Sequence, residues 1–589
     1  MGVKDEGRTR SRGGTTYYVD PARGCDDAGG SERERPWRSF APVNGLILAP
    51  GDRVEIVAGG EFHETLAIAG AGSVDAPIEV SFAPGRYDFH PDQARARKYD
   101  ISNTNDGRDI EKVMAILLDG VRHVAISGPG ARIVMRGKMI ELCVNGSEDV
   151  TVTGLQFDYH RPTVSEFTVV SVAPDHADLA IHEDSPFTIE DKRIVWQGEG
   201  WSYGNGEGVI AQELDLGEDA VWRRRNPLRG LEAEALSPGL LRVRGGHDMA
   251  EGRVYQLRNP FRDCVGVFLR RSRDVTFRDV DFLFMHGMGV LCQLTENITL
   301  DSVRIAPDEK SGRTCAAWAD CMHFSGCRGR IVARDCVFSG AHDDAINVHG
   351  TYLRVVEVVS PNQIKVRFMH RQTFGFMAFN PGDEIDFVRW DTLDVLGSNR
   401  VVDAKLLNSR EMLLTLERSA PRGGRENDVI ENVTWTPEVE ITGCTVSRIP
   451  TRGFLVSTRR RAVVSGNVFN RTWMSGVLVA CDAESWFESG CVRDLTISKN
   501  RFDRCRKPAV LIKPANSEPN DAVHRNIRIA ENEFVLAEDV AVDAYSTTGL
   551  TVEGNTVLSA SPTDAGGAIR TRGCSDVRVE GNSFSTKGA

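Results

Sequence analysis

One short phrase recurs five times between residues 463 and 584, as VVSGNVF (463–469), LTISKNRF (495–502), IRIAENEF (527–534), LTVEGNTV (550–557) and VRVEGNSF (577–584). Each copy holds an alternating strand, a turn that ends in asparagine, and a second short apolar segment. The asparagine returns at intervals of 33, 32, 23 and 27 residues, at Asn467, Asn500, Asn532, Asn555 and Asn582. A repeat of about this length, built from strands and turns, is typical of a solenoid.

The repeat predicts an all-β chain folded as a parallel β-helix. Second strands such as GVLVA (476–480) and AVLIK (509–513) lie between the copies. We expect each asparagine to adopt the left-handed conformation at the turn and to hydrogen-bond along the stack. A Rossmann fold or an α/β barrel would require helical periodicity between the strands, and the sequence has almost none.

Toward the N-terminus the coil pattern continues but is interrupted twice. Copies of the phrase begin at Val275, Ile298 and Arg330, whereas two long stretches contain alternating strands without it. The polar stretch from about Tyr87 to Lys112 is expected to form a surface loop. The predicted segments are a cap with the first coils (1–160), a β-rich insertion (161–258), central coils (259–350), a second β-rich insertion (351–436) and C-terminal coils (437–589).

The composition of the chain limits the kinds of molecule that the protein is expected to bind. The net charge of -12 argues against a nucleic-acid partner, because binding to phosphates needs a basic face. No apolar run approaches the roughly 20 residues that span a membrane, and the first residues lack the apolar core of a signal peptide. The chain is expected to be soluble, cytoplasmic as the sequence stands or secreted if an export signal has been removed. A homo-oligomer is left open.

The 13 cysteines show no CxxC spacing and no paired Cys/His motif, which disfavours a zinc site. Five of them are close in sequence, namely Cys292, Cys315, Cys321, Cys327 and Cys336. Free cysteine is a small apolar residue that buries well, so we expect these side chains in the narrow core of the solenoid. No metal and no cofactor is expected.

Three aspartates in the stretch from Trp318 to Gly350 are the candidate functional centre. Asp320 and Asp344 are 24 residues apart, which is about one coil, and Asp343 precedes Asp344. Aligning the second strands places Asp320 and Asp344 in one column, which Arg452 joins on a later coil. Regular alternation would turn Asp344 toward the core with Ile346, so a local turn before Ala345 is expected to bring the aspartates to the surface.

A single aspartate in a solenoid turn is usually structural, because it caps backbone amides. Three within one coil, among ring-bearing and amide side chains, instead resemble a sugar site, and clustered carboxylates raise one another's pKa. The candidate substrate-binding residues are His323, His342, Asn347, His349, Arg452, Trp318, Trp473 and Arg161. For each of them a structural role, such as packing or a surface ion pair, is the competing interpretation.

Four motifs together resemble glycoside hydrolase family 110, the α-1,3-galactosidases that remove terminal galactose from blood-group-B-type glycans. They are HDDAINVHG (342–350), ADCMHF (319–324), DYHRP (158–162) and the FGF and GDEIDF segments (374–387). The resemblance covers most of the chain from Tyr17 onward. It implies a right-handed parallel β-helix with two barrel-like insertions, and exo-acting hydrolysis with inversion and without a metal.

The resemblance further implies that Asp320, Asp343 and Asp344 are the catalytic carboxylates. One would protonate the glycosidic oxygen and another would activate water. Which aspartate is the acid stays open, as does the preference for a branched blood-group-B-type glycan or linear Gal-α-1,3-Gal.

Two other functions compete with this one. Pectin-type hydrolases also place aspartates on adjacent coils of a β-helix, but an acidic polymer calls for a basic groove, and the sequence shows no row of Lys or Arg along the solenoid. A non-catalytic glycan-binding β-helix would need no buried acid cluster.

Overall fold

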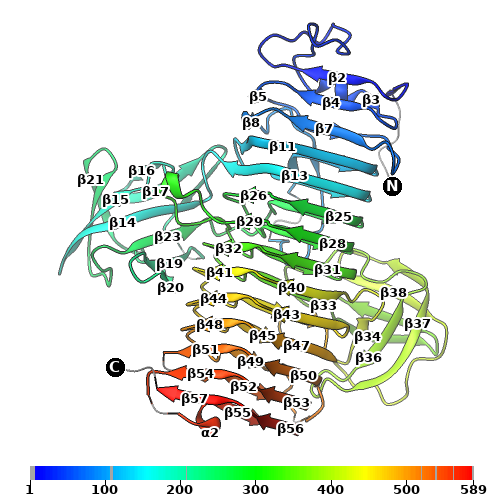
Figure 1. Cartoon of the computed structure of the whole chain (residues 1–589), viewed down its shortest axis with the longest axis vertical. Coiled ribbons are helices and arrows are strands. Elements are labelled where there is room, and N and C mark those ends of the chain that lie inside the picture. The colour runs from blue at the N-terminus through cyan, green and yellow to red at the C-terminus, as the bar shows by residue number, and fades with distance from the viewer. Residues whose placement is uncertain are drawn as a thin grey trace.

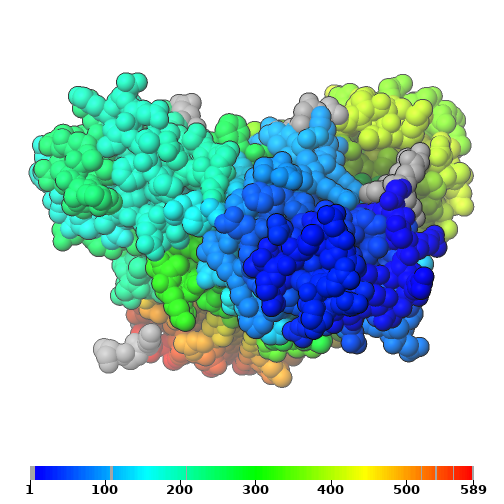
Figure 2. All heavy atoms as spheres, turned by 90° about the horizontal axis from the view of Figure 1, so that it is seen from above, coloured from blue at the N-terminus to red at the C-terminus, as the bar shows by residue number. Residues whose placement is uncertain are grey.

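The chain folds into one long solenoid that carries an insertion on each side (Figure 1). The computed structural model describes residues 7–106, 110–206, 208–518, 520–537, 540–561 and 563–586. Seen from above, the two insertions form separate lobes that flank the coils (Figure 2). The predicted parallel β-helix is confirmed, because successive coils pair strand on strand in parallel ladders.

One face of the solenoid, called the site sheet below, carries the strands nearest the aspartates. In spatial order it runs through β6 (Leu66–Ile68), β10 (Lys112–Asp119), β12 (Ile140–Asn145), β24 (Val267–Arg270), β27 (Val290–Gln293), β30 (Met322–Ser325), β33 (Ile346–Thr351), β42 (Phe454–Val456), β45 (Val477–Val479), β49 (Val510–Ile512), β52 (Val542–Tyr545) and β55 (Ile569–Arg572).

The other two faces are formed by the alternating strands that begin each coil and by the short strands after the turns. The first series is β2 (Thr16–Val19), β4 (Arg53–Ile56), β7 (Ile78–Phe82), β11 (Arg122–Met135), β13 (Glu148–Tyr159), β25 (Arg273–Arg278), β28 (Glu296–Asp301), β31 (Arg328–Arg334), β40 (Glu438–Thr442), β43 (Arg461–Ser465), β47 (Asp494–Ser498), β50 (His524–Ala530), β53 (Thr547–Glu553) and β56 (Ser575–Glu580). The second is β5 (Gly60–Phe62), β8 (Gly85–Phe89), β26 (Asp281–Phe282), β29 (Arg304–Ile305), β32 (Val337–Ser339), β41 (Thr445–Ser447), β44 (Val468–Asn470), β48 (Arg501–Asp503), β51 (Glu533–Leu536), β54 (Thr556–Ser559) and β57 (Ser583–Thr586).

A few short elements complete the solenoid. They are β1 (Thr9–Arg10), α1 (Ala41–Asn44), β3 (Leu46–Ile47), β9 (Ala96–Arg97), the 3-10 helix Glu309–Ser311, β46 (Glu488–Ser489) and α2 (Ala565–Ala568). Among the helices that the structure describes, none has the length and apolar character needed to span a membrane.

The first insertion is a seven-stranded antiparallel sheet with a three-stranded sheet packed against it. The larger sheet has the order β20 (Ala220–Arg225), β19 (Ile210–Asp215), β23 (Val254–Arg258), β14 (Val164–Ala173), β15 (His176–Ile181), β22 (Leu240–Arg244) and β21 (Glu232–Ser237), and the smaller one is β16 (Phe187–Glu190), β17 (Arg193–Gly198) and β18 (Trp201–Gly204). The two sheets share one apolar core, in which Phe167 and Trp196 are buried. The segment that follows β23 returns the chain to the coils, and the Arg223 side chain of β20 reaches them by donating to the His342 carbonyl oxygen.

The second insertion closes into a six-stranded antiparallel barrel. Its order is β34 (Leu353–Ser360), β35 (Gln363–Arg367), β38 (Glu411–Leu416), β37 (Val395–Leu406), β36 (Glu384–Val388) and β39 (Val429–Asn432), and β39 pairs again with β34. Apolar side chains at alternate positions of the strands fill its interior, as expected for a small barrel.

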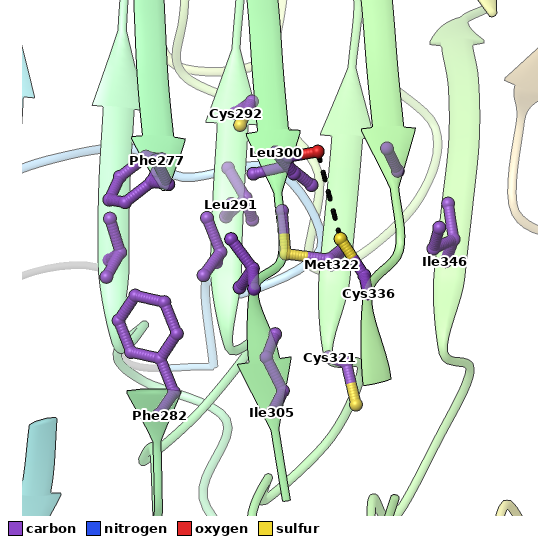
Figure 3. Packing of buried hydrophobic residues seen from close by; sticks show 14 of the residues in the cluster. Phe277, Phe282, Leu291, Cys292, Leu300, Ile305, Cys321, Met322, Cys336 and Ile346 are labelled. Carbon is purple, nitrogen blue, oxygen red and sulfur yellow. Dashed lines mark hydrogen bonds between the residues drawn. The ribbon is translucent and has the colours of Figure 1, made fainter. Parts of the chain in front are cut away.

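The solenoid core is apolar and includes the clustered cysteines. Cys292, Cys321 and Cys336 pack among Leu, Ile, Met and Phe side chains contributed by neighbouring coils (Figure 3). All five cysteines predicted for the core are at most 1% exposed and are free thiols. Their small size suits an interior in which strands of adjacent coils lie only about 4.8 Å apart.

The recurring asparagines form a buried ladder. Asn467, for example, receives a hydrogen bond on its Oδ1 from the Cys444 N–H, and its own N–H and side-chain amide donate to Asn500 Oδ1 at 2.9 Å. The expected left-handed conformation of the asparagine is wrong, because the preceding residue adopts it instead, as at Lys499 with φ 57° and Gly466 with φ 68°. That residue makes the turn, which leaves the asparagine free to point inward and bond along the stack.

Candidate active site

The predicted column of aspartates is confirmed by the register of the site sheet. Met322 pairs with Ile346, and Ile346 with Phe454. Asp320, Asp344 and Arg452 each lie two residues before these partners and therefore follow one another on successive coils. The chain bends at this point, and the strands begin only at Met322 and Ile346. The bend lets the aspartates line a pocket while the strand residues stay in the core.

A pocket of about 410 Å³ lies over this column. Its polar lining residues are Asn103, Arg223, Arg262, Asp320, His323, Asp343, Asp344, Asn347, Arg452, Asp482, Glu488 and Lys513. They come from four parts of the chain: the coils, the first insertion with its return segment, the stretch around Asn103, and the segment that leads into β46. The closest oxygens of the three aspartates lie within 4.8 Å of one another.

Asp343 is the ionised member of the cluster. Arg262 Nη2 donates to its Oδ2 at 3.2 Å, and Arg223 Nη2 lies 3.9 Å from its Oδ1. Burial alone would raise the pKa of this carboxyl. The neighbouring guanidinium groups, Arg223 and Arg262 first among them, outweigh burial and hold the pKa of Asp343 well below its usual range. With a side chain that is 20% exposed, Asp343 is a carboxylate open to the pocket at neutral pH.

Asp320 and Asp344 are shifted in the opposite direction. Burial, with the charge of Asp343 added, raises the pKa of Asp320 to about 8. Burial also raises the pKa of Asp344 to about 7, although Arg452 opposes it by donating its Nη2 to Asp344 Oδ2 at 2.7 Å. The pocket thus holds carboxyl groups with widely separated pKa values, the arrangement that lets one act as an acid and another as a base.

The other predicted residues divide into those in the pocket and those outside it. His323, Asn347 and Arg452 line it, and the Asn347 Oδ1 is buried without a hydrogen-bond partner among the described residues. His349 does not line the pocket; it lies on β33, the next coil after His323, and is hydrogen-bonded to His323. Asn347 is 4% exposed, which leaves its free acceptor suited to a hydroxyl donor of a ligand.

Four further predicted residues do not line the pocket. His342 is buried and bonds to Gln256 of β23 at 2.9 Å. Trp318 is 1% exposed and packs under the guanidinium group of Arg258, 4.2 Å from the ring centroid. Trp473 lines a separate pocket with Trp222. Arg161 pairs with Asp184 in the first insertion.

Several pocket residues could not be found from the sequence. The stretch from Tyr87 to Lys112 was expected to be a surface loop, but Asn103 is 4% exposed and donates to Glu488 Oε1 at 3.0 Å. Residues 107–109 of that stretch lie outside the described residues. Arg262 and Glu488 belong to no repeat and no motif, so nothing local marked them.

The oxygens of the three aspartates are also close enough together to bind one cation. Asp343 and Asp344 are already bonded to Arg262 and Arg452, and Arg223 lies close by. This positive surrounding disfavours a cation, so we assign no metal to the cluster. Because Arg262 and Arg452 are bonded to these aspartates, they do not form a row of free arginines that could bind an acidic polymer.

Comparisons with known proteins find matching family models, relatives of similar sequence and solved structures. The family described as GLAA-B beta-barrel domain II matches residues 363–430, and the right handed beta helix region matches residues 429–588. An alpha-1,3-galactosidase A of Akkermansia muciniphila is 41% identical over 93% of this chain and 92% of its own length. An alpha-1,3-galactosidase A of Bacteroides thetaiotaomicron is 38% identical over 89% of this chain and 94% of its own length. A solved family 28 exopolygalacturonase of Yersinia enterocolitica is 10% identical with a TM-score of 0.38, over 96% of this chain and 79% of that one.

Proposed function

The chain belongs to glycoside hydrolase family 110, the family of the α-1,3-galactosidases, and from that membership we propose that it removes terminal α-1,3-linked galactose with inversion. The substrate is a blood-group-B-type glycan, linear Gal-α-1,3-Gal, or both. The observation that carries the proposal is the convergence of Asp320, Asp343 and Asp344 on one pocket.

The charge states suit the two-carboxylate scheme of a glycosidase. A carboxyl that is protonated at neutral pH can donate to the glycosidic oxygen, and an ionised carboxylate can take a proton from water. Asp320 and Asp344 have raised pKa values, whereas the pKa of Asp343 is lowered. We propose Asp343 as the base and an acid among the other two.

The walls of the pocket favour attack on a chain end. Arg223 closes it from the first insertion, and Asn103 and Glu488 close it from another side. Trp486, which also lines the pocket, lies 4.3 Å from the His370 ring of the second insertion, measured between centroids. A pocket walled by the first insertion on one side, and on another by Trp486 packed against the second insertion, suits one terminal sugar better than the middle of a polymer.

The anomer of the first product tests inversion. We expect proton NMR to show β-galactose as the first sugar released from Gal-α-1,3-Gal or from the branched B trisaccharide, followed by slow mutarotation. The carboxylate spacing alone does not select this outcome, because the closest oxygens lie within 4.8 Å, whereas inverting pairs are commonly about 6.5–9.5 Å apart. Family membership supports inversion here.

Two results would contradict the proposal. Initial release of α-galactose would show retention and a covalent intermediate. No hydrolysis of either sugar, together with cleavage of polygalacturonic acid assayed in parallel, would instead favour the pectin-type activity. Rates on the two galactosides rank the branched and linear acceptors.

A further inference from the structure

A chain of short hydrogen bonds leads from Asp320 into the protein behind the pocket. Asp320 Oδ2 lies 2.7 Å from His323 Nδ1, and His323 Nε2 lies 2.9 Å from His349 Nε2. His349 Nδ1 lies 2.6 Å from the carbonyl oxygen of Gly350. Both imidazoles are buried, with His323 0% and His349 2% exposed.

The hydrogen bond from His349 to the Gly350 carbonyl determines which atom carries each hydrogen in this series of bonds. A carbonyl oxygen only accepts, so His349 Nδ1 must carry the hydrogen and, in the neutral ring, its Nε2 must be an acceptor. His323 Nε2 must therefore donate, which leaves a bare His323 Nδ1. A bare nitrogen can face Asp320 at 2.7 Å only if the carboxyl supplies the hydrogen.

We propose that the buried pair His323 and His349 keeps a proton on Asp320 and thereby makes Asp320 the general acid of the site. This inference rests on the proposed function and resolves which aspartate donates. His323 and His349 act as positioning residues, because they act on the substrate only through Asp320.

The same count of protons allows a competing arrangement. The extra proton could instead rest on His349, whose Nε2 lies 3.5 Å from Glu488 Oε1, with Asp320 ionised. Burial lowers the pKa of His323 to about 4 and also lowers the pKa of His349, even though Glu488 opposes the latter shift. Burial raises the pKa of Asp320. These directions all place the proton on Asp320.

The charged groups around Asp320 do not reverse this preference. Those that act on it are Asp343, Asp344, Glu488, Arg262, Arg452 and Arg258. Arg452 and Arg262 favour ionised Asp320, but each is bonded to another aspartate of the cluster. The acidic neighbours favour the neutral carboxyl, and so does the bare His323 nitrogen.

The catalytic step then balances as follows. The O–H bond of Asp320 breaks as a bond forms from that hydrogen to the glycosidic oxygen, and the C1–O bond breaks with its electron pair going to the leaving sugar. Water bonds to C1 and gives a proton to Asp343. Asp320 is left ionised beside the bare His323 nitrogen, which favours its reprotonation from solvent.

The substitution His349→Phe tests the role of these hydrogen bonds. Without the acceptor on His349, His323 can move its hydrogen to Nδ1 and donate to an ionised Asp320, which lowers the pKa of the acid. An acid is active below its pKa, so the alkaline limb of kcat/KM should move to lower pH. We expect a shift of at least about one unit, or about tenfold less activity at pH 8 relative to pH 5.5 than in the parent.

The matched control is His524→Phe, because His524, at 0% exposed, is buried in the coils as His349 is but does not line the pocket. Its alkaline limb should stay where the parent's lies. An equal loss at every pH in His349→Phe would assign His349 a packing role and overturn the proposal.

A second measurement does not depend on turnover. Nitrogen-15 NMR of labelled histidine at pH 7, assigned with His323→Phe and His349→Phe, should show neutral His323 protonated on Nε2 and neutral His349 protonated on Nδ1. A charged His349, or His323 protonated on Nδ1, would overturn the proposal. If the tautomers are as expected but the protein hydrolyses no galactoside, the proposed function fails and Asp320 has no role as an acid. The arrangement of protons would then still stand.

Discussion

Asp320→Asn and Asp343→Asn should each lower kcat on the better galactoside by about 10²–10⁴-fold, the usual contribution of a general acid or base. Asp344→Asn should lower kcat as well, because the Asp344 carboxyl holds Arg452 beside the cluster. Asparagine keeps the volume of the side chain but can neither donate a carboxyl proton nor carry the negative charge that accepts one. The assay is galactose release, with folding checked by circular dichroism. Asp494→Asn, on an exposed part of β47, is the control and should keep the parental rate.

The three variants should differ in stability even though all lose activity. In Asp320→Asn the amide can donate to His323 Nδ1 just as a neutral carboxyl does, so the fold should be nearly unaffected. In Asp344→Asn the buried pairing with Arg452 loses its negative charge, which should be the more destabilising change. Full activity in any folded variant would remove that aspartate from the catalytic set.

Asn500→Ala should destabilise the fold by about 2–5 kcal/mol, because it leaves two or more buried polar groups without a partner at about 1–3 kcal/mol each. Asn500 Oδ1 accepts from the Asn467 N–H, and its amide donates to the Val464 carbonyl and to Asn532 Oδ1, each at 2.9 Å. Alanine removes all of these partners from the interior of the coil at once.

The last asparagine of the same ladder allows the effect of burial on stability to be compared. Asn582 makes the equivalent bonds to Asn555 and Val552, but it is partly exposed, so water can replace it. We expect Asn582→Ala to cost clearly less free energy of unfolding than Asn500→Ala in urea titrations. Equal costs would show that the bonds of the ladder, rather than their burial, set the effect.

The geometry of the pocket assigns different roles to chemically identical side chains. Asp343 is surrounded by guanidinium groups and is held ionised, whereas Asp320 faces a neutral buried histidine and is held protonated. Asp343 and Asp344 are adjacent in the chain, yet their pKa values move in opposite directions. Environment alone separates them.

The sequence by itself determined the solenoid, its two interruptions and the column shared by Asp320 and Asp344. These features follow from local pattern, because consecutive coils of a β-helix pair with one another and a shared period sets the register. It also placed the cysteines in the core. It misplaced the left-handed residue of the turn, since asparagine and its predecessor both tolerate that conformation.

Only the tertiary structure decided which groups face the aspartates. Asn103 and Glu488 are 385 residues apart and form one wall, and Arg262 reaches Asp343 from the end of an insertion. The same structure buried Trp318 and moved Trp473 to a separate pocket. Periodicity encodes contacts between neighbouring coils, but it carries no information on where an insertion returns its loops. The charge state of each aspartate depends on those loops and on burial, and therefore on the folded chain as a whole.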